Sequence, residues 1–176
     1  LSQPERDVVV RKPGEMNRIE REQLVQVHPD DAYAHTVEAH TGYHGKNEAW
    51  YILEADPGAE IVYGLSRPLS KEALSEALRT GRAFSVLRRV PVRVGQTIYV
   101  PAGTVHALGP GLLLYEVQQR SDLTYRLYDF GRGRQLHLEK GLEVAHLQPR
   151  RLPAATGPGT LVDSSWFSLR RLVLDN

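Results

Sequence analysis

Two side chains in the stretch "LVQVHPDD" could bind a metal ion. Gln26 and His28 are two residues apart, so in a β-strand both point to one face, while Val25 and Val27 point to the other and can pack. Pro29 cannot continue a central β-ladder, which places His28 at the end of its strand. A histidine in an apolar run more often packs than binds, so this stretch alone leaves both roles open.

A second stretch carries residues that could complete such a site. In "GKNEAWYIL", Glu48 opens an apolar strand, and Lys46 lies two residues earlier, where it could share the same face. A carboxylate can be a metal ligand, and a lysine beside a site can hold a phosphate or take part in proton transfer. Both residues are also typical of a solvated strand edge, so this stretch does not decide between the two roles.

The stretch "YVPAGTVHALG" places a histidine after a tight turn. Pro101 fits the second position of that turn and Gly103 lies two residues later, so we expect His106 at the start of the next strand. Barrel proteins keep ligand sites at such strand ends. A hairpin with a half-buried histidine explains the same piece.

An arginine lies inside another β-like run, "LTYRLYDF". Strand alternation places Thr124, Arg126 and Tyr128 on one face, with Tyr125 and Leu127 on the other. If the Arg126 face is interior, the guanidinium needs an anionic partner, and its fork geometry matches a carboxylate or a phosphate. If that face meets solvent, Arg126 is an ordinary surface residue.

The elements that must position these residues are mostly short strands. Seven β-rich runs alternate with turn residues, a pattern typical of an antiparallel sandwich or barrel: "LVQVH", "EAWYILEA", "AEIVYGL", "VPVRVG", "TIYVPAG", "GLLLYEVQQ" and "LTYRLYDF". A helix is expected in "PLSKEALSEALRTG", with Ser70 as its N-cap and Gly81 at its end. We expect a second helix in "QLHLEKGLEVAHL" and further strands at Val8 to Val10 and in "SWFSLRRLVL".

The composition is that of one globular domain. The chain has 176 residues, 41% hydrophobic and 24% charged, with a formal net charge of +1. This balance gives no reason to expect nucleic acid or a membrane as a partner. Because there are no cysteines, a metal would be held by imidazole, carboxylate and amide oxygen. The first ten residues lack the pattern of a signal peptide, which favours a cytoplasmic location.

Four stretches, taken in order, carry a family resemblance. Together "QVHPDD", "GKNEAWYIL", "VPAGTVHALG" and "EVQQRSDLTYRLYDFGR…LHLEK" strongly resemble the type I phosphomannose isomerases (mannose-6-phosphate isomerases), especially the shorter bacterial forms. The resemblance runs from about Gln23 to Leu147. It implies an all-β dominated fold, a cupin-type antiparallel β-barrel (jelly roll) with one or two short helices, and one Zn²⁺ per chain.

The resemblance also implies roles for individual residues. It implies four metal ligands: Gln26, His28, Glu48 and His106. The implied reaction is the aldose–ketose isomerisation of mannose 6-phosphate and fructose 6-phosphate. That reaction needs a polarised carbonyl, a base and a holder for the phosphate. Arg126 is the implied catalytic arginine and could also bind the substrate, while Lys46 and Lys140 are candidates for proton transfer or phosphate contact.

The expected organisation has three parts. Residues 1–22 form a lead-in that matches the family poorly, and residues 23–150 form the metal-binding cupin domain. Residues 151–176 form a linker, "LPAATGPGT", and a C-terminal strand that could begin a second β-rich region. Family members have a longer segment before the first motif and continue into such a region, so a fragment or a compact relative is expected here.

Two other functions stay open on the sequence alone. A regulatory cupin could bind metal and hexose phosphate without turnover, as the short N-terminal part would suggest. A different cupin enzyme, such as an iron oxygenase, could use the same two histidines and carboxylate, which also suit ferrous iron. The motif around Arg126 favours the isomerase over the oxygenase.

Overall fold

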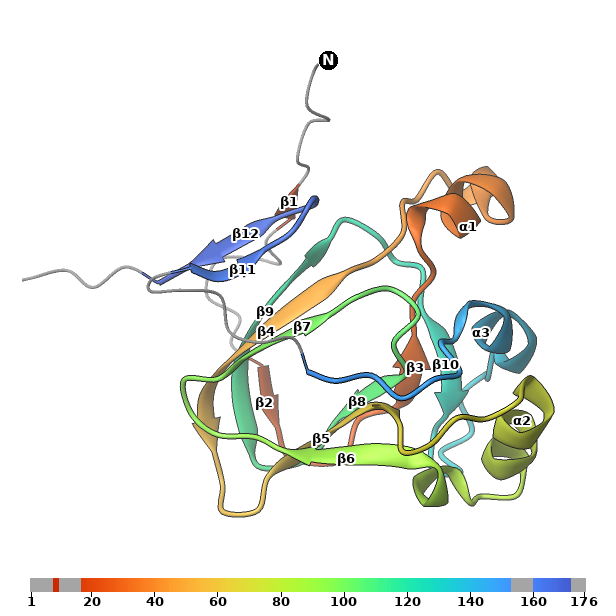
Figure 1. The fold of residues 1–176 in the computed structure, drawn as a ribbon, viewed down its shortest axis with the longest axis horizontal. Coiled ribbons are helices and arrows are strands. Elements are labelled where there is room, and N and C mark those ends of the chain that lie inside the picture. The colour runs from red at the N-terminus through yellow and green to blue at the C-terminus, as the bar shows by residue number, and fades with distance from the viewer. Residues whose placement is uncertain (1–7, 10–16, 153–159, 172–176) are drawn as a thin grey trace, which may run out of the picture.

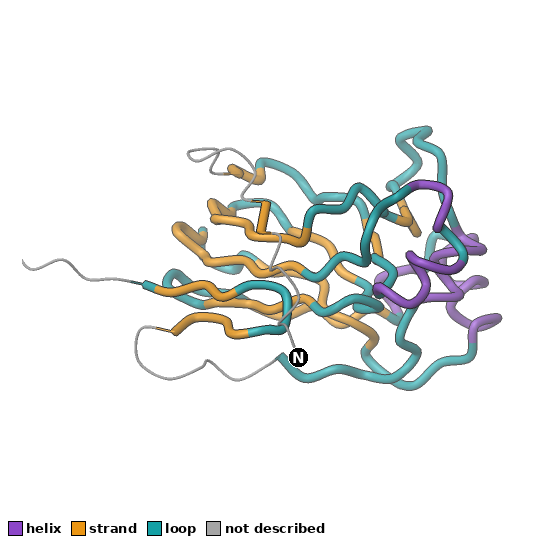
Figure 2. Tube along the Cα trace, turned by 90° about the horizontal axis from the view of Figure 1, so that it is seen from above, coloured by secondary structure: helices purple, strands orange, loops and turns teal. Residues whose placement is uncertain are grey.

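Two antiparallel β-sheets of five strands each face one another in the computed structural model, which describes residues 8–9, 17–152 and 160–171. Three short α-helices lie beside the sheets in the described residues (Figure 1). From above, the strands fill one end of the molecule and the helices the other (Figure 2). The expected β-dominated cupin-type fold is confirmed, with three helices in place of the one or two expected.

The first sheet is built around its longest strands. Its members are β1 (Val8–Val9), β2 (Asn17–Ile19), β4 (Glu48–Ala55), β7 (Thr97–Val100) and β9 (Leu112–Gln119). β9 pairs with β4 along one edge and with β1 and β2 along the other, and β4 pairs in turn with β7. Part of the 1–22 segment therefore joins this sheet.

The second sheet has the strand order β10-β3-β8-β5-β6. Its strands are β3 (Val25–Val27), β5 (Glu60–Leu65), β6 (Leu87–Pro91), β8 (His106–Leu108) and β10 (Tyr125–Tyr128). A separate hairpin of β11 (Thr160–Asp163) and β12 (Ser168–Arg170) lies on the far side of the first sheet (Figure 1).

The helices are α1 (Asp31–Thr36), α2 (Lys71–Arg79) and α3 (Leu138–Val144), with 3-10 turns η1 (Ala39–Thr41) and η2 (Ala83–Ser85). The expected helices in "PLSKEALSEALRTG" and "QLHLEKGLEVAHL" correspond to α2 and α3. α1 was not expected, although its N-cap follows a known pattern: the Asp30 carboxylate accepts a hydrogen bond from the Tyr33 amide at 2.8 Å.

Three apolar clusters divide the molecule into layers. The middle cluster, which includes Trp50, Ile61 and Leu114, fills the space between the two sheets. A second cluster packs the outer face of the second sheet against α2 and α3. A third cluster packs the β11–β12 hairpin, through Val162 and Phe167, on the outer face of the first sheet. One end of the intersheet space is thus apolar core, which leaves the other end for polar residues.

Two expected strands differ from the observed ones. The strand expected in "VPVRVG" forms earlier in the chain than predicted. β6 starts at Leu87, and its pairing with β5 ends at Pro91. The residues after it turn instead, with Gly95 at φ +82°. In "SWFSLRRLVL" the described strand is β12, which is shorter than the expected one. Val10 of the expected first strand lies outside the described residues, as do residues 153–159 of the expected linker. Within the described residues, no helix has the length and apolarity needed to cross a membrane.

The N-cap of α2 provides a test of local stability. Ser70 Oγ accepts a hydrogen bond from the Ala73 amide at 3.2 Å, as the sequence predicted. We expect Ser70→Ala to lower the free energy of unfolding by about 1 kcal/mol, because an amide at the helix start loses its partner. Urea unfolding followed by circular dichroism measures this loss.

The matched control is Ser75→Ala, which lies inside the same helix. Alanine has the higher helix propensity, so this variant should be as stable as the parent or slightly more stable. Equal losses in the two variants would contradict the capping role of Ser70.

Candidate metal centre and active-site cavity

Three neighbouring strands of the second sheet place three functional side chains in one row. Arg126 on β10 is directly opposite Gln26 on β3, and Gln26 is directly opposite His106 on β8. Residues that are opposite one another in an antiparallel ladder point to the same face. That face is interior, because Tyr125 and Leu127, which alternate with Arg126, pack in the outer cluster against the helices. The interior alternative for Arg126 is therefore the correct one.

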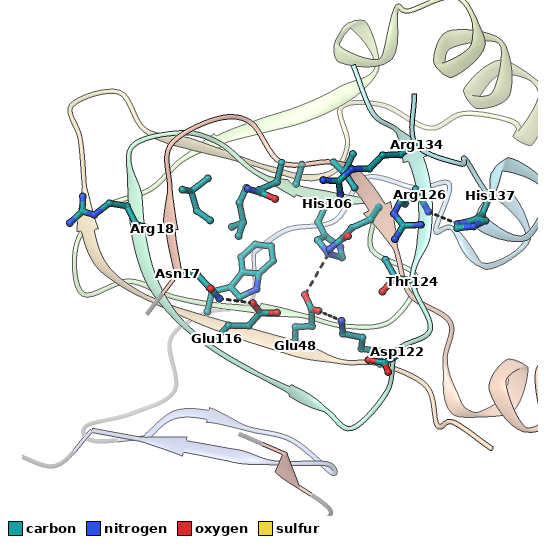
Figure 3. A pocket seen from close by; sticks show the side chains of 18 residues that line it. Asn17, Arg18, Glu48, His106, Glu116, Asp122, Thr124, Arg126, Arg134 and His137 are labelled. Carbon is teal, nitrogen blue, oxygen red and sulfur yellow. Dashed lines mark hydrogen bonds and ion pairs between the residues drawn. The ribbon is translucent and has the colours of Figure 1, made fainter. Parts of the chain in front are cut away.

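Glu48 meets the two histidines from the opposite sheet, at the start of β4. Its Oε1 lies 3.1 Å from Nε2 of His28. Its Oε2 lies 3.5 Å from Nε2 of His106 (Figure 3). All three side chains are only 1% exposed. Donors bound tetrahedrally to one zinc ion at about 2.1 Å lie ~3.4 Å apart, so the observed spacing fits such an ion. These three residues are called the His28–Glu48–His106 cluster below.

Backbone carbonyls fix the orientation of both imidazoles. Nδ1 of His28 lies 2.9 Å from the carbonyl of Leu123, and Nδ1 of His106 lies 2.8 Å from the carbonyl of Thr104. A carbonyl can only accept, so in the neutral rings Nδ1 carries the proton and Nε2 presents a lone pair. Metal-binding histidines are commonly oriented in this way by a hydrogen bond from the other ring nitrogen.

Two buried atoms of the cluster have no partner with hydrogen-bond geometry in the described part of the chain: Nε2 of His28 and Oε1 of Glu48, although Oε1 forms an ion pair with Lys46. The two atoms are close, but their geometry is not that of a hydrogen bond. Buried polar atoms are rarely left in this state without a ligand or water. A cation between the imidazoles and the carboxylate would satisfy both atoms, so the residues present fit a metal ion.

Gln26 is placed to extend the cluster. Its Nε2 lies 3.1 Å from Nε2 of His106. A half-turn of the side-chain amide would present Oε1 instead, which is the atom that a metal ligand requires. The structure thus brings together all four ligands that the family resemblance implied.

Charge in the cluster is balanced by a buried lysine. Lys46 is 6% exposed, and its Nζ lies 3.0 Å from Oε1 of Glu48. Burial by itself would raise the pKa of Glu48, but His28 and Lys46 outweigh it and hold that pKa well below its ordinary value. Burial lowers the pKa of His106 to about 4, against the opposing pull of Glu48. At neutral pH the cluster therefore offers a carboxylate and a neutral His106 imidazole, the forms that bind metal.

Asn47, between Lys46 and Glu48, was missed by sequence reasoning. Its side-chain Oδ1 accepts from the Ala102 amide at 2.9 Å, and its Nδ2 donates to Oε1 of Gln119 at 2.5 Å. The buried side chain thus ties the start of β4 to the turn before His106. An asparagine beside a loop is an ordinary solvated residue in sequence, so no local pattern could have identified this role.

The turn before His106 starts one residue later in the chain than expected. The Thr104 amide donates to the carbonyl of Pro101 at 3.1 Å, so Pro101 is the first residue of the turn and Gly103 the third. Gly103 has φ +79°, which suits the third position of a type II turn. The Gly103 amide also donates to the carbonyl of His28 at 2.8 Å, which joins the two histidine segments.

A cavity of about 650 Å³ opens beside the cluster. Gln26, Lys46, Glu48 and His106 contribute to its wall. Figure 3 shows Arg126 and Arg134 beside the cluster, with Glu116 and Asn17 on the other side of Glu48. A space of this size, with cations on one side and carboxylates within reach, suits a small polar anion.

Sequence reasoning did not identify four of the polar residues in the cavity wall: Asn17, Glu116, Arg134 and His137. Glu116 could have been found, because alternation along "LLLYEVQQ" places it on the same face as the buried Leu112 and Leu114. His137 could not, since it returns to the cavity only through the loop after β10. Its backbone amide donates to the carbonyl of Arg126 at 2.8 Å, and its Nδ1 accepts from the Arg126 amide at 3.2 Å.

Lys140 lies apart from the other predicted site residues. It is on α3, its ammonium pairs with the buried carboxylate of Glu38, and Tyr125 donates to the same oxygen. It does not contribute to the wall of the cavity. Its assignment to the substrate stays a prediction.

No family profile matches the chain. Several named proteins match it, among them two mannose-6-phosphate isomerases. The mannose-6-phosphate isomerase of Streptococcus mutans is 44% identical over 154 residues, which cover 84% of this chain and 45% of the relative. The mannose-6-phosphate isomerase ManA of Bacillus subtilis is 48% identical over 126 residues, which cover 68% of this chain and 39% of the relative. The chain thus spans less than half the length of these two relatives.

A solved structure agrees with these relatives. The crystal structure of a mannose 6-phosphate isomerase from Bacillus subtilis matches with a TM-score of 0.77 and 36% identity, over 87% of this chain and 52% of that one. Over the matched residues this chain is homologous to the mannose-6-phosphate isomerases and shares their cupin-type fold.

Proposed function

We propose that this chain forms the metal-dependent active site of a mannose-6-phosphate isomerase, which interconverts mannose 6-phosphate and fructose 6-phosphate. The observation that carries the proposal is the His28–Glu48–His106 cluster, whose donors converge at the wall of a cavity that also contains Arg126. The names of the homologues support the choice of reaction. A cytoplasmic location is part of the proposal and rests on the sequence alone.

The proposed metal is one Zn²⁺, held by His28, Glu48 and His106, with Gln26 as a fourth ligand. Two imidazoles and a carboxylate are the ligand set of a catalytic zinc site, and the amide of Gln26, the weakest of the four ligands, is the one that substrate would replace. When bound, the ion supplies Lewis acidity to the sugar oxygens at the reacting carbons. The same donors also suit ferrous iron, but the names of the homologues favour the isomerase.

The two arginines of the cavity provide positive charge for the substrate. Arg126 projects from β10 into the cavity, and Arg134 follows it on the loop that ends at α3. A guanidinium binds phosphate oxygens in pairs, and it also stabilises negative charge that develops during a reaction. Two hydrogen bonds to the Arg126 backbone, one from the His137 amide and one accepted by the His137 side chain, hold the end of that loop against β10.

Proton transfer between C1 and C2 of the sugar requires a base near the cluster. Two groups at the cavity wall could serve: Lys46, whose ammonium contacts Glu48, and the carboxylate of Glu116. The Glu116 carboxylate accepts a hydrogen bond from Nδ2 of Asn17 at 3.4 Å, so β2 takes part in orienting it. The polar segment before Leu24 therefore contributes to the proposed active site.

Metal removal tests the role of the cluster. We expect turnover of mannose 6-phosphate, measured by a coupled assay for fructose 6-phosphate, to disappear after chelation and to return when zinc is added. His28→Gln and His106→Gln should each weaken zinc binding by at least about 10-fold, because a direct ligand is lost.

His40→Ala is the matched control, since His40 is 73% exposed and lies outside the cluster. It should keep both zinc and activity. Undiminished turnover in metal-free protein would contradict the proposed mechanism. Metal-loaded protein that binds the sugar phosphate without product would favour the regulatory cupin, and oxygen consumption would favour the oxygenase.

Arg126→Met tests the charge in the cavity. We expect kcat/KM to fall by about 100-fold or more, because a charged donor to the reacting substrate is removed while the metal ligands remain. Zinc content should be unchanged. Arg132→Met is the control, because Arg132 is exposed and its guanidinium lies over the Phe130 ring. A normal kcat/KM in Arg126→Met would contradict the assignment.

Lys140→Met separates the two lysines of the sequence prediction. Because the Lys140 ammonium pairs with Glu38, the structure favours an unchanged KM for mannose 6-phosphate in this variant. A KM raised by about 10-fold with normal zinc content would support the substrate role that the sequence predicted. Steady-state kinetics of Lys140→Met beside Lys46→Met make the comparison.

A further inference from the structure

A second group of metal-binding side chains lies outside the cavity. Asp31 is the first residue of α1, His35 lies one turn later on the same helix, and His44 lies in the segment between η1 and β4. One ligand atom from each lies within 4.8 Å of the others. His35 and His44 are exposed, and Asp31 is half-buried. None of the three contributes to the wall of the cavity.

The two imidazoles already face one another through their ring nitrogens. Nε2 of His35 lies 2.8 Å from Nδ1 of His44, and the rings meet edge to face with centroids 5.0 Å apart. A pair at this distance shares one proton, which a metal ion can replace. Two nitrogens bound to one ion lie ~3.4 Å apart in tetrahedral geometry, so the rings need to separate by about half an ångström. Both side chains are exposed and can turn by that amount.

Asp31 is held in place by groups from three other segments. Its Oδ1 accepts from the Gly45 amide at 2.8 Å and from Nε2 of Gln119 at 3.5 Å, and its Oδ2 accepts from Nε1 of Trp166 at 2.9 Å. Hydrogen bonds of this kind orient the carboxylates that bind metals, and Oδ2 keeps a lone pair for the ion. The carboxylate is thus fixed in position before any ion binds.

A close backbone approach keeps His44 next to α1. A Cβ at Gly45 would lie 2.4 Å from the carbonyl carbon of Asp30 and from the nitrogen of Asp31, so only glycine fits there. The segment that carries His44 therefore runs directly against the first turn of the helix that carries His35. This backbone contact therefore fixes how far the segment with His44 lies from Asp31 and His35.

We propose that Asp31, His35 and His44 form a second, surface metal site for a divalent transition ion such as Zn²⁺, Ni²⁺ or Cu²⁺. Imidazole nitrogen selects these ions over Mg²⁺ and Ca²⁺, which prefer sites made of oxygen ligands. Water completes the coordination, because two of the three ligands face solvent. The exposed site binds its ion more weakly than the buried cluster does.

The chain links the second site to the first by short segments. Asp31 lies three residues after His28, and His44 lies two residues before Lys46. An ion at the second site would fasten α1 to the segment that leads into Lys46 and Glu48. The site is independent of the proposed isomerase reaction, because none of its three ligands lines the cavity.

The test counts metal ions and uses the full chain without a histidine tag. Protein with its buried cluster already loaded is titrated with ZnCl₂ in a calorimeter. We expect a further binding event of about one ion per chain. His35→Ala and His44→Ala should each weaken that event by at least about 10-fold, while His40→Ala, which removes an exposed histidine nearby, should leave it unchanged.

A second readout locates the ion. In proton NMR spectra, zinc should shift the ring resonances of His35 and His44 and leave those of His40 in place. Titration with MgCl₂ should shift none of these ring resonances. Absence of the additional event in the parent protein would overturn the proposal, as would its persistence in both alanine variants or its equal loss in His40→Ala. None of these outcomes depends on whether the chain isomerises a sugar.

Discussion

A carboxylate almost completely removed from water is the constraint on which the centre of this molecule depends. Glu48 is 1% exposed, and an ionised group at that depth is stable only beside positive charge or a cation. Lys46 supplies one charge from the same strand segment, and the two imidazoles approach from the opposite sheet. The two sheets therefore meet at this point through electrostatics, whereas elsewhere they meet through apolar packing.

The rest of the structure keeps that arrangement rigid. The register of β10, β3 and β8 aligns Arg126, Gln26 and His106, and a shift of one residue in any of these strands would turn a side chain out of the cavity. The helices pack on the outer face of that sheet, and the β11–β12 hairpin packs on the outer face of the other. Each sheet is thus covered on its outer side and contributes one part of the site on its inner side.

Local signals in the sequence predicted most of the strands, α2 and α3, but not β2 or β11. The four-residue ligand set came from the family resemblance and stays a prediction. Alternation fixes the faces of a strand, and the four ordered motifs carry the family resemblance. The sequence did not predict α1, the position of Pro101 within its turn, or the bridging role of Asn47. These features depend on long-range contacts, such as the bond between Asn47 and the Ala102 amide, that no local pattern contains. Lys140, a lysine beside a motif, lies outside the cavity wall in the folded chain, and its substrate role stays a prediction.

The chain contains two tryptophans, and the fold places them in different optical environments. Trp50 is 1% exposed, contributes to the wall of the cavity and lies edge to face with the His106 ring, with centroids 5.5 Å apart. Trp166 is half-buried on the hairpin and donates to Asp31. Fluorescence from a buried indole differs in wavelength from that of a half-solvated one, so the two residues act as separate internal reporters. An event in the cavity and an event at the surface histidines can therefore be followed independently, without an added label.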